Sequence, residues 1–87
     1  MASYKIEWKR SAEKDLRKID RLRIPLIMEA VEALTKDPFP PGCRKLHGTE
    51  HQYRVRVGDN RVIYEVDGER NGVVIYHIRH RKDAYRK

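Results

Sequence analysis

Apolar and polar residues alternate along four short segments, one near the start of the chain and three in its last third. The segments are residues 4–8, 52–57, 61–67 and 73–79. Alternation with a period of two predicts strands that bury one face. Residues 58–60 and 68–72 lie between the last three segments and carry the glycine and asparagine residues that hairpin turns favour. We therefore predict a mostly antiparallel four-stranded sheet.

Two helical segments separate the first strand from the others. Ser11 is expected to cap the first helix, over residues 12–19, in which acidic residues come early and basic residues late. The second helix begins near Pro25, and residues 37–42, with three prolines and a glycine, end it. Three apolar residues follow Pro25 at helical spacing: Ile27, Val31 and Leu34. The order β-α-α-β-β-β predicts one α+β domain over residues 1–87, with a helix hairpin on one face of the sheet.

The alternation also assigns each strand residue to a face of the sheet. The expected core positions are Tyr53, Val55, Val57, Val62, Tyr64, Val66, Val74, Tyr76 and Ile78. The expected open face carries Arg54, Arg56, Arg61, His77, Arg79 and Arg81. The last strand has a second interpretation, because Val73 and Ile75 are also apolar and a strand buried on both sides shows the same pattern.

The net charge of +7 and the pI near 9.8 favour a polyanionic partner. The chain is 38% charged, which would also solubilise any small protein. Two observations favour a nucleic acid over a membrane surface. The strongest cationic positions lie on predicted strands and not on an amphipathic helix. Aromatic residues also lie among the charges: Tyr53, Tyr64, Tyr76 and Tyr85.

Several classes of site and location are not expected. Cys43 is the one cysteine, so no internal disulfide or cysteine zinc cluster can form. The four histidines, His47, His51, His77 and His80, lie on predicted loops and at the last strand and not on a helix, and we expect neither a metal nor a cofactor. Residues 1–9 lack the apolar stretch of a signal peptide, and no run reaches membrane-spanning length. We therefore expect a cytoplasmic protein.

Motifs along nearly the whole length resemble the RelE/ParE superfamily of bacterial and archaeal toxins. They are Lys45-Leu46-x-Gly48, Tyr53-Arg54-Val55-Arg56-Val57-Gly58-Asp59, Arg61-Val62-Ile63-Tyr64-Glu65-Val66 and His80-Arg81-Lys82-Asp83-x-Tyr85. The resemblance implies the RelE-like microbial ribonuclease fold. Its RelE branch implies a toxin of a type II toxin-antitoxin system, an mRNA interferase that enters the ribosomal A site and cuts mRNA there.

The resemblance also implies site residues. The positions that match those implicated in catalysis are Arg54, Arg56, Arg61, Arg81 and Tyr85. We expect Arg61 and Arg81 to hold the scissile phosphate, because arginine forks fit phosphate oxygens. RNA-backbone contacts are expected from Lys45, Arg54, Arg56, Arg79 and Lys82. This chain departs from some relatives, which have lysine in place of Arg54 and Arg56, and glycine in place of Arg79.

Metal-independent cleavage by the RNA 2′-hydroxyl still requires proton transfer, which a guanidinium supplies poorly. Tyr85 is the favoured group, since its phenol can move a proton if nearby arginines lower its pKa. His80 is the other candidate, because an unperturbed histidine pKa near 6.5 suits neutral pH. Alternation points His80 towards the core, so it could act only if the strand ended before it.

Two alternative functions remain open. A ParE-like protein of the same fold would inhibit gyrase and cut nothing, and a non-catalytic RNA- or ribosome-binding module would need only the basic charge. For the toxin, we expect the ribosome and its mRNA as targets. We also expect a small acidic antitoxin that covers Arg54, Arg56 or the helix pair, in a toxin-antitoxin hetero-oligomer.

Overall fold

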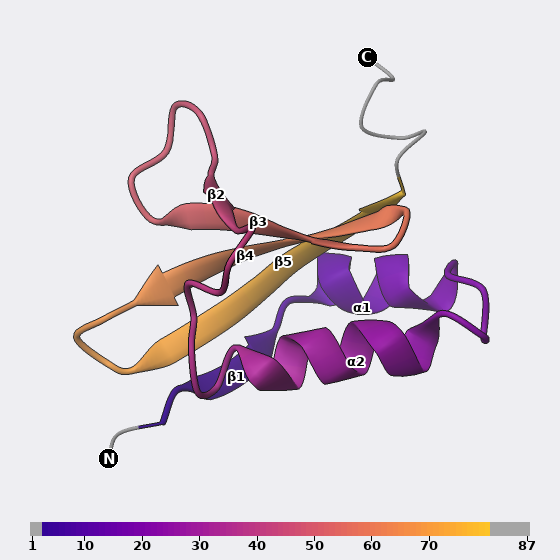
Figure 1. Cartoon of the computed structure of the whole chain (residues 1–87), viewed down its shortest axis with the longest axis horizontal. Coiled ribbons are helices and arrows are strands. Elements are labelled where there is room, and N and C mark those ends of the chain that lie inside the picture. Colours follow the sequence, from indigo (N-terminus) through magenta and orange to yellow (C-terminus); the bar gives the residue numbers. More distant parts are fainter. Residues whose placement is uncertain (1–2, 81–87) are drawn as a thin grey trace.

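The computed structural model in Figure 1 describes residues 3–80 and has two helices under one face of a mixed sheet. The helices are α1 (Arg10–Arg17) and α2 (Ile24–Ala33), and the strands are β1 (Lys5–Trp8), β2 (Arg44–Lys45), β3 (Gln52–Val57), β4 (Asn60–Asp67) and β5 (Gly72–His80). The sheet order is β1-β5-β4-β3-β2, with β1 parallel to β5 and the other pairs antiparallel. The predicted α+β fold and the order of its main elements are confirmed.

The sheet has five strands, one more than predicted. The additional strand β2 contains two residues, which pair with β3 as Arg44↔Arg54 and Lys45↔Tyr53. Two residues are too few to show alternation, so the sequence pattern could not reveal this strand. Its position matters because it brings Arg44 beside the arginines of β3.

The start of α1 also differs from the prediction. The residue at the N-cap is Lys9, and no side chain caps the helix. The Ser11 hydroxyl instead donates a 2.6 Å hydrogen bond to the backbone carbonyl of Tyr76 in β5. This bond joins two parts of the chain that are far apart in sequence and fastens α1 to the sheet.

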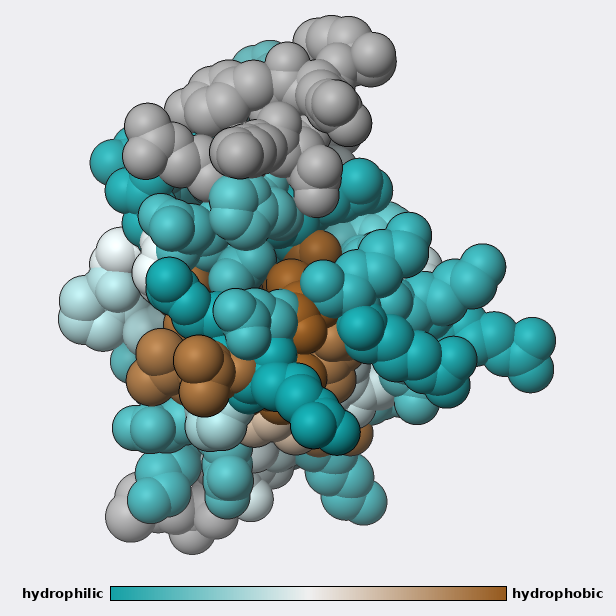
Figure 2. All heavy atoms as spheres, turned by 90° about the vertical axis from the view of Figure 1, so that its right-hand side faces the viewer, coloured by the Kyte–Doolittle hydropathy of each residue, from teal (hydrophilic) through white to brown (hydrophobic). Residues whose placement is uncertain are grey.

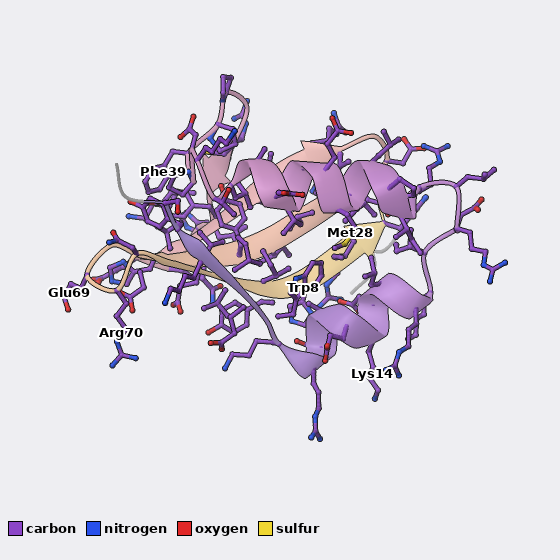
Figure 3. The ribbon with its side chains drawn as sticks, turned by 90° about the horizontal axis from the view of Figure 1, so that it is seen from below. Trp8, Lys14, Met28, Phe39, Glu69 and Arg70 are labelled. Atoms are coloured by element: carbon purple, nitrogen blue, oxygen red, sulfur yellow. The ribbon has the colours of Figure 1, made fainter. Side chains whose placement is uncertain are left out.

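The core lies between the sheet and the helices, as Figure 3 shows from the helix side, with Trp8 in the space between the two helices. The buried apolar residues are Ala12, Ile27, Val31, Leu34, Val62, Tyr64, Val66, Val73, Ile75 and Ile78. The predicted core positions of β4 are therefore buried. Those of β3 are only partly buried, because this strand lies near the edge of the sheet.

A bulge in β5 makes two of the predicted core positions wrong. Tyr64 pairs with Ile75 and Ile63 pairs with His77, so Tyr76 is an extra residue on β5. An extra residue shifts the alternation of faces. Before the bulge the buried residues are Val73 and Ile75, while Val74 and Tyr76 are only partly buried. After it the predicted alternation holds, with Ile78 in the core.

Neither described helix, at eight and ten residues, is long and apolar enough to span a membrane.

Candidate nucleic-acid interface

Three arginines lie side by side across three strands of the open sheet face. The strand register pairs Arg56 of β3 with Arg61 of β4, and Arg61 with Arg79 of β5. Directly opposite residues in antiparallel strands have Cβ atoms about 4.5–5.5 Å apart, and like charges at such positions are destabilising. We call these three residues the arginine row. Because the row lowers stability, folding alone does not explain why these cations lie together.

The arginine row continues into a groove at the β2 edge of the sheet. Gly42, Arg44, Arg54, Arg56 and Arg61 line this groove, whose volume is about 420 Å³. Arg54 and Arg61 are partly buried, whereas Arg44 and Arg56 are exposed. Partial burial restricts a guanidinium, so Arg54 and Arg61 are the better oriented donors. We call these five residues the arginine groove.

Within the part of the chain that the structure describes, no ion pair compensates the charge of the arginines of the row and the groove. The ion pairs within residues 3–80 are Glu50–His51, Asp67–Arg70 and Asp15–His77, and none of them includes an arginine of the row or the groove. Because no acidic side chain within residues 3–80 forms an ion pair with these guanidiniums, their donors are available to a polyanion.

Arg44 is the groove residue that the sequence did not reveal. It precedes the Lys45-Leu46-x-Gly48 motif and lies at the end of the proline-rich loop, where no periodicity applies. It joins the groove because β2 pairs with β3 and places it opposite Arg54. Lys45, expected to contact RNA, is its exposed neighbour in β2 and does not line the groove.

A buried tyrosine fastens the loop that leads to Arg44. The Tyr64 hydroxyl donates a 2.7 Å hydrogen bond to the Pro38 carbonyl. Tyr53 lies between the rings of Tyr64 and Phe39, with centroid separations of 6.1 Å and 5.0 Å. Burial, and to a lesser degree the neighbouring Cys43, raises the pKa of Tyr64 far above its usual range. Tyr64 is therefore a neutral structural donor that holds one wall of the groove.

Helix α1 holds the part of β5 that carries Arg79. Strand β1 pairs with β5 only as far as Ile75, and α1 supplies the hydrogen bonds beyond that point. The Ile78 backbone N–H donates to Asp15 Oδ2 at 3.1 Å, and His77 Nδ1 lies 3.2 Å from the same oxygen. This carboxylate fixes the edge of β5 next to the arginine row.

The opposite end of the open face has a different character. The Tyr76 hydroxyl donates to Glu65 Oε2 at 3.3 Å, and Lys9 Nζ lies 5.9 Å from the centre of the Tyr76 ring. Burial and the nearby carboxylate of Glu65 raise the pKa of Tyr76. Glu7 and Asp67 lie in the same surface region as Glu65. The cationic character is thus concentrated at one end of the sheet.

The remaining predicted site residues divide into two groups. A catalytic role for His80 was expected to require that the last strand end before this residue. Strand β5 instead extends through His80. His80 lies opposite Asn60 in the register and lines a hollow with Ile78, apart from the arginine groove. Arg81, Lys82 and Tyr85 lie outside the described residues. Among residues 3–80, His, Cys, Asp and Glu side chains form no group of three that could hold a metal ion.

Comparison with known proteins agrees with this geometry. The model of the family described as "ParE toxin of type II toxin-antitoxin system, parDE" matches residues 6–85. The chain is also 32% identical to Toxin RelG of Mycobacterium tuberculosis, over 97% of this chain and 98% of that one. This chain is a type II toxin of the RelE/ParE superfamily. Its relatives named RelG and RelE place the toxin in a RelE-like branch.

Solved structures agree on the fold of the toxin. The RelBE2 toxin-antitoxin complex of Mycobacterium tuberculosis contains a chain that superposes with a TM-score of 0.81 at 25% identity, over 91% of this toxin and 99% of that chain. The RelE-RelB complex of Pyrococcus horikoshii gives a TM-score of 0.80 at 27% identity, over 91% and 96% of the two chains. The similarity therefore extends over almost the entire domain.

Proposed function

We propose that this toxin is a ribosome-dependent endoribonuclease that cuts mRNA in the A site. The observation that carries the proposal is the arginine row, Arg56, Arg61 and Arg79, together with the uncompensated arginine groove beside it. An RNA backbone offers negatively charged oxygens at regular intervals, and clustered arginine donors bind them strongly. The ribosome as the target places this action in the cytoplasm.

The proposed reaction uses a nucleophile that RNA itself supplies. The 2′-oxygen attacks the adjacent phosphorus as its proton leaves, and the bond from phosphorus to the 5′-oxygen breaks as that oxygen gains a proton. The products are a 2′,3′-cyclic phosphate, or the 3′-phosphate formed from it, and a 5′-hydroxyl. The reaction as written needs no metal, because arginine N–H groups stabilise the charge that develops on the phosphate oxygens.

Each arginine has a proposed role. Arg61 lies in the middle of the row and is partly buried, which suits it to the scissile phosphate together with Arg81. Arg54 and Arg56 hold the adjoining backbone in the groove, and Arg79 holds it at the other end of the row. Proton transfer is assigned to Tyr85, with His80 as the other candidate.

Purified ribosomes programmed with a defined mRNA provide the direct test. Mapping of new 5′ ends after addition of the toxin should show cuts at the A-site codon, with 5′-hydroxyl termini. Free mRNA without ribosomes is the matched control and should be cut far less. Intact mRNA on programmed ribosomes, with a correctly folded toxin, would contradict the proposal.

A gyrase inhibitor is the second candidate function, because the family model that matches the chain is described as ParE. It predicts that the toxin blocks DNA supercoiling by purified gyrase and leaves mRNA on ribosomes intact. A non-catalytic RNA- or ribosome-binding module predicts neither effect, but tight binding to ribosomes. The two purified assays, run on one preparation, separate the three functions.

An antitoxin partner completes the proposal. The similar solved structures include toxin-antitoxin complexes from Mycobacterium tuberculosis and Pyrococcus horikoshii. With a net charge of +7 and an uncompensated arginine groove, this toxin suits a small protein that carries an acidic segment. We expect that partner to cover Arg54 and Arg56 or the helix pair, in a hetero-oligomer whose association rate falls steeply as salt is added.

A further inference from the structure

The proposed cleavage moves two protons, and Tyr85 accounts for one of them. One proton leaves the 2′-hydroxyl of the RNA, and one reaches the 5′-oxygen that departs. A second group for proton transfer should lie on the open face of the sheet, within reach of a phosphate on the arginine row. The row lies near the β3–β4 turn, at the end of the molecule that Figure 2 faces, where hydrophilic side chains surround a strip of apolar atoms.

His77 lies on the open face beside the arginine row. Its register partner in β4 is Ile63, and the neighbouring pair on the same face is Arg61↔Arg79. Ile78, which lies between His77 and Arg79, is buried in the core, so the two flanking residues are on the other face. His77 is therefore a diagonal neighbour of Arg61. Such neighbours in antiparallel strands are about 7–8 Å apart, which long side chains and a ligand between them can span.

The Asp15 carboxylate of α1 fixes the ring of His77. Asp15 Oδ2 lies 3.2 Å from His77 Nδ1 and also accepts from the Ile78 backbone N–H at 3.1 Å. An ionised carboxylate only accepts hydrogen bonds, so the hydrogen between the two side chains belongs to Nδ1. In a neutral imidazole the lone pair is then on Nε2, as it is in the histidine bases that an aspartate orients.

Helix α1 is fastened to β5 on either side of this contact. The Ser11 hydroxyl, one turn before Asp15, donates to the Tyr76 carbonyl at 2.6 Å. The side chain of Asp15 is 24% exposed and that of His77 is 34% exposed. Partial burial restricts both side chains, while the ring of His77 remains accessible to a ligand. The pair is therefore held in place by the fold before any RNA binds.

The charges near His77 have both signs. Asp15 contacts the ring from α1, and Arg61 and Arg79 share its face of the sheet. Glu65 lies further along the same face of β4. The carboxylate of Asp15 can stabilise an imidazolium, and the two arginines can hold a phosphate next to it. A base and phosphate donors are therefore combined on one face.

We propose that His77 is the general base of the cleavage reaction and that Asp15 positions it. The inference rests on the proposed function, because RNA bound on the arginine row supplies the proton. Nε2 accepts the proton of the 2′-hydroxyl as the 2′-oxygen bonds to phosphorus, and Asp15 stabilises the imidazolium that forms. Tyr85 donates a proton to the 5′-oxygen as the bond from phosphorus to that oxygen breaks. Exchange with water then returns both side chains to their starting protonation states.

Substitution of His77 tests its role in single-turnover cleavage of mRNA on programmed ribosomes. His77→Gln keeps a polar side chain and removes the base, and general acid–base catalysis typically contributes about 10²–10⁴-fold. We expect the cleavage rate at saturating toxin to fall by at least about 100-fold, while the affinity for ribosomes changes little. His51→Gln is the matched control, because His51 is 68% exposed and does not line the arginine groove. Cleavage by His77→Gln at the parental rate would overturn the inference.

Added imidazole distinguishes a lost base from a lost contact. His77→Ala leaves space beside Asp15, and imidazole in solution should raise the cleavage rate of this variant by about tenfold or more. The rescued rate should increase with pH and level off once the added imidazole is neutral. Arg61→Gln, which lacks a phosphate donor, should not respond to imidazole. If a folded, ribosome-bound His77→Ala toxin gains no activity from imidazole, His77 is not the base.

Asp15→Asn tests the positioning role. The asparagine oxygen can still accept from the Nδ1–H and from the Ile78 N–H, but the side chain carries no charge to stabilise the imidazolium. We expect the cleavage rate to fall by about tenfold, because a hydrogen bond to a charged group is the stronger one. Hydrogen exchange of the Ile78 amide should match that of the parent. An unchanged rate, or a slower rate found only together with faster exchange, would contradict the role of Asp15.

Failure of this inference and failure of the proposed function give different results. If the parent toxin cuts no mRNA on ribosomes, both are wrong. If the parent cuts mRNA and His77→Gln cuts it equally well, the base lies elsewhere and the proposed function stands.

Discussion

Replacing Arg61 by glutamine should change activity and stability in opposite directions. Arg61 has an arginine opposite it on each neighbouring strand, Arg56 on one side and Arg79 on the other. Glutamine keeps part of the aliphatic stem of this partly buried side chain, so little packing is lost. The charge and the guanidinium fork are removed, and the two effects of that removal can be measured separately.

The activity should fall because a phosphate donor is lost. Removal of one preorganised donor to a developing oxyanion typically costs about 10²–10³ in rate, or about 3–4 kcal/mol. We therefore expect the A-site cleavage rate of Arg61→Gln to fall by at least about 100-fold. Cleavage on programmed ribosomes measures this loss, with toxin in excess so that weaker binding does not limit the rate.

The stability should rise because a repulsion is lost. With opposite guanidiniums roughly 7 Å apart and the dielectric constant of water, each pair repels by about 0.6 kcal/mol, so two pairs give about 1 kcal/mol. Salt screens exposed charges, with a Debye length of about 30 Å at 0.01 M and about 3 Å at 1 M. Urea unfolding of Arg61→Gln should therefore show a gain of up to about 1 kcal/mol at low salt, which disappears at 1 M.

Arg70→Gln is the matched control for both measurements. Arg70 is 88% exposed and lies 3.9 Å from an Asp67 carboxylate oxygen, away from the row. Neither cleavage nor salt-dependent stability should change appreciably in this variant. The assignment of Arg61 would be refuted if Arg61→Gln cut mRNA at the parental rate. The proposed repulsion within the arginine row would be refuted if Arg61→Gln were less stable than the parent at low salt.

Three further predictions test the hydrogen bonds of Tyr64 and Asp15 near the site and the residue that transfers the proton. Tyr64→Phe should lose about 1–2 kcal/mol of stability, because a buried carbonyl loses its donor. Folding raises the pKa of Tyr64 above its value near 10 in the unfolded chain. The stabilisation by Tyr64 is therefore complete below about pH 10 and is lost as the pH rises further. In unfolding experiments at pH 9–11, the stability of Tyr64→Phe should depend less on pH than that of the parent. Asp15→Ala should speed hydrogen exchange of the Ile78 amide, whose acceptor it removes. In cleavage of ribosome-bound mRNA, Tyr85→Phe should lose most of the activity and His80→Gln should keep most of it; the reverse result would assign proton transfer to His80.

The sequence pattern was a good guide where one face of an element is buried and the other is not. Strand β4 alternates strictly, and its burial follows that alternation residue by residue. Its register with β3 and β5 then brings Arg61 between Arg56 and Arg79, so most of the arginine row could be predicted. The alternation predicts which face each residue occupies, because successive side chains of a strand point to opposite faces of the sheet.

The same pattern failed where the backbone departs from regular geometry. One extra residue at Tyr76 exchanges the faces of β5, and both faces of this strand are apolar enough to accept either arrangement. Strand β2 is defined by its pairing with β3, a long-range contact without a local signal. Arg44 joins the groove through this contact, so its place there could not be derived from spacing in the sequence.

The distribution of charge over the open face limits where an RNA strand can lie. At one end, Arg56, Arg61 and Arg79 have no carboxylate partner within residues 3–80. At the other end, Glu65 already accepts from Tyr76, and a phosphate there would meet a carboxylate. Lys5, Lys9 and Arg70 lie in the same surface region as Glu7, Glu65 and Asp67, so the charge at that end is balanced. Attraction at the row therefore favours a strand that runs across β3, β4 and β5 near the β3–β4 turn and not along the full length of the sheet.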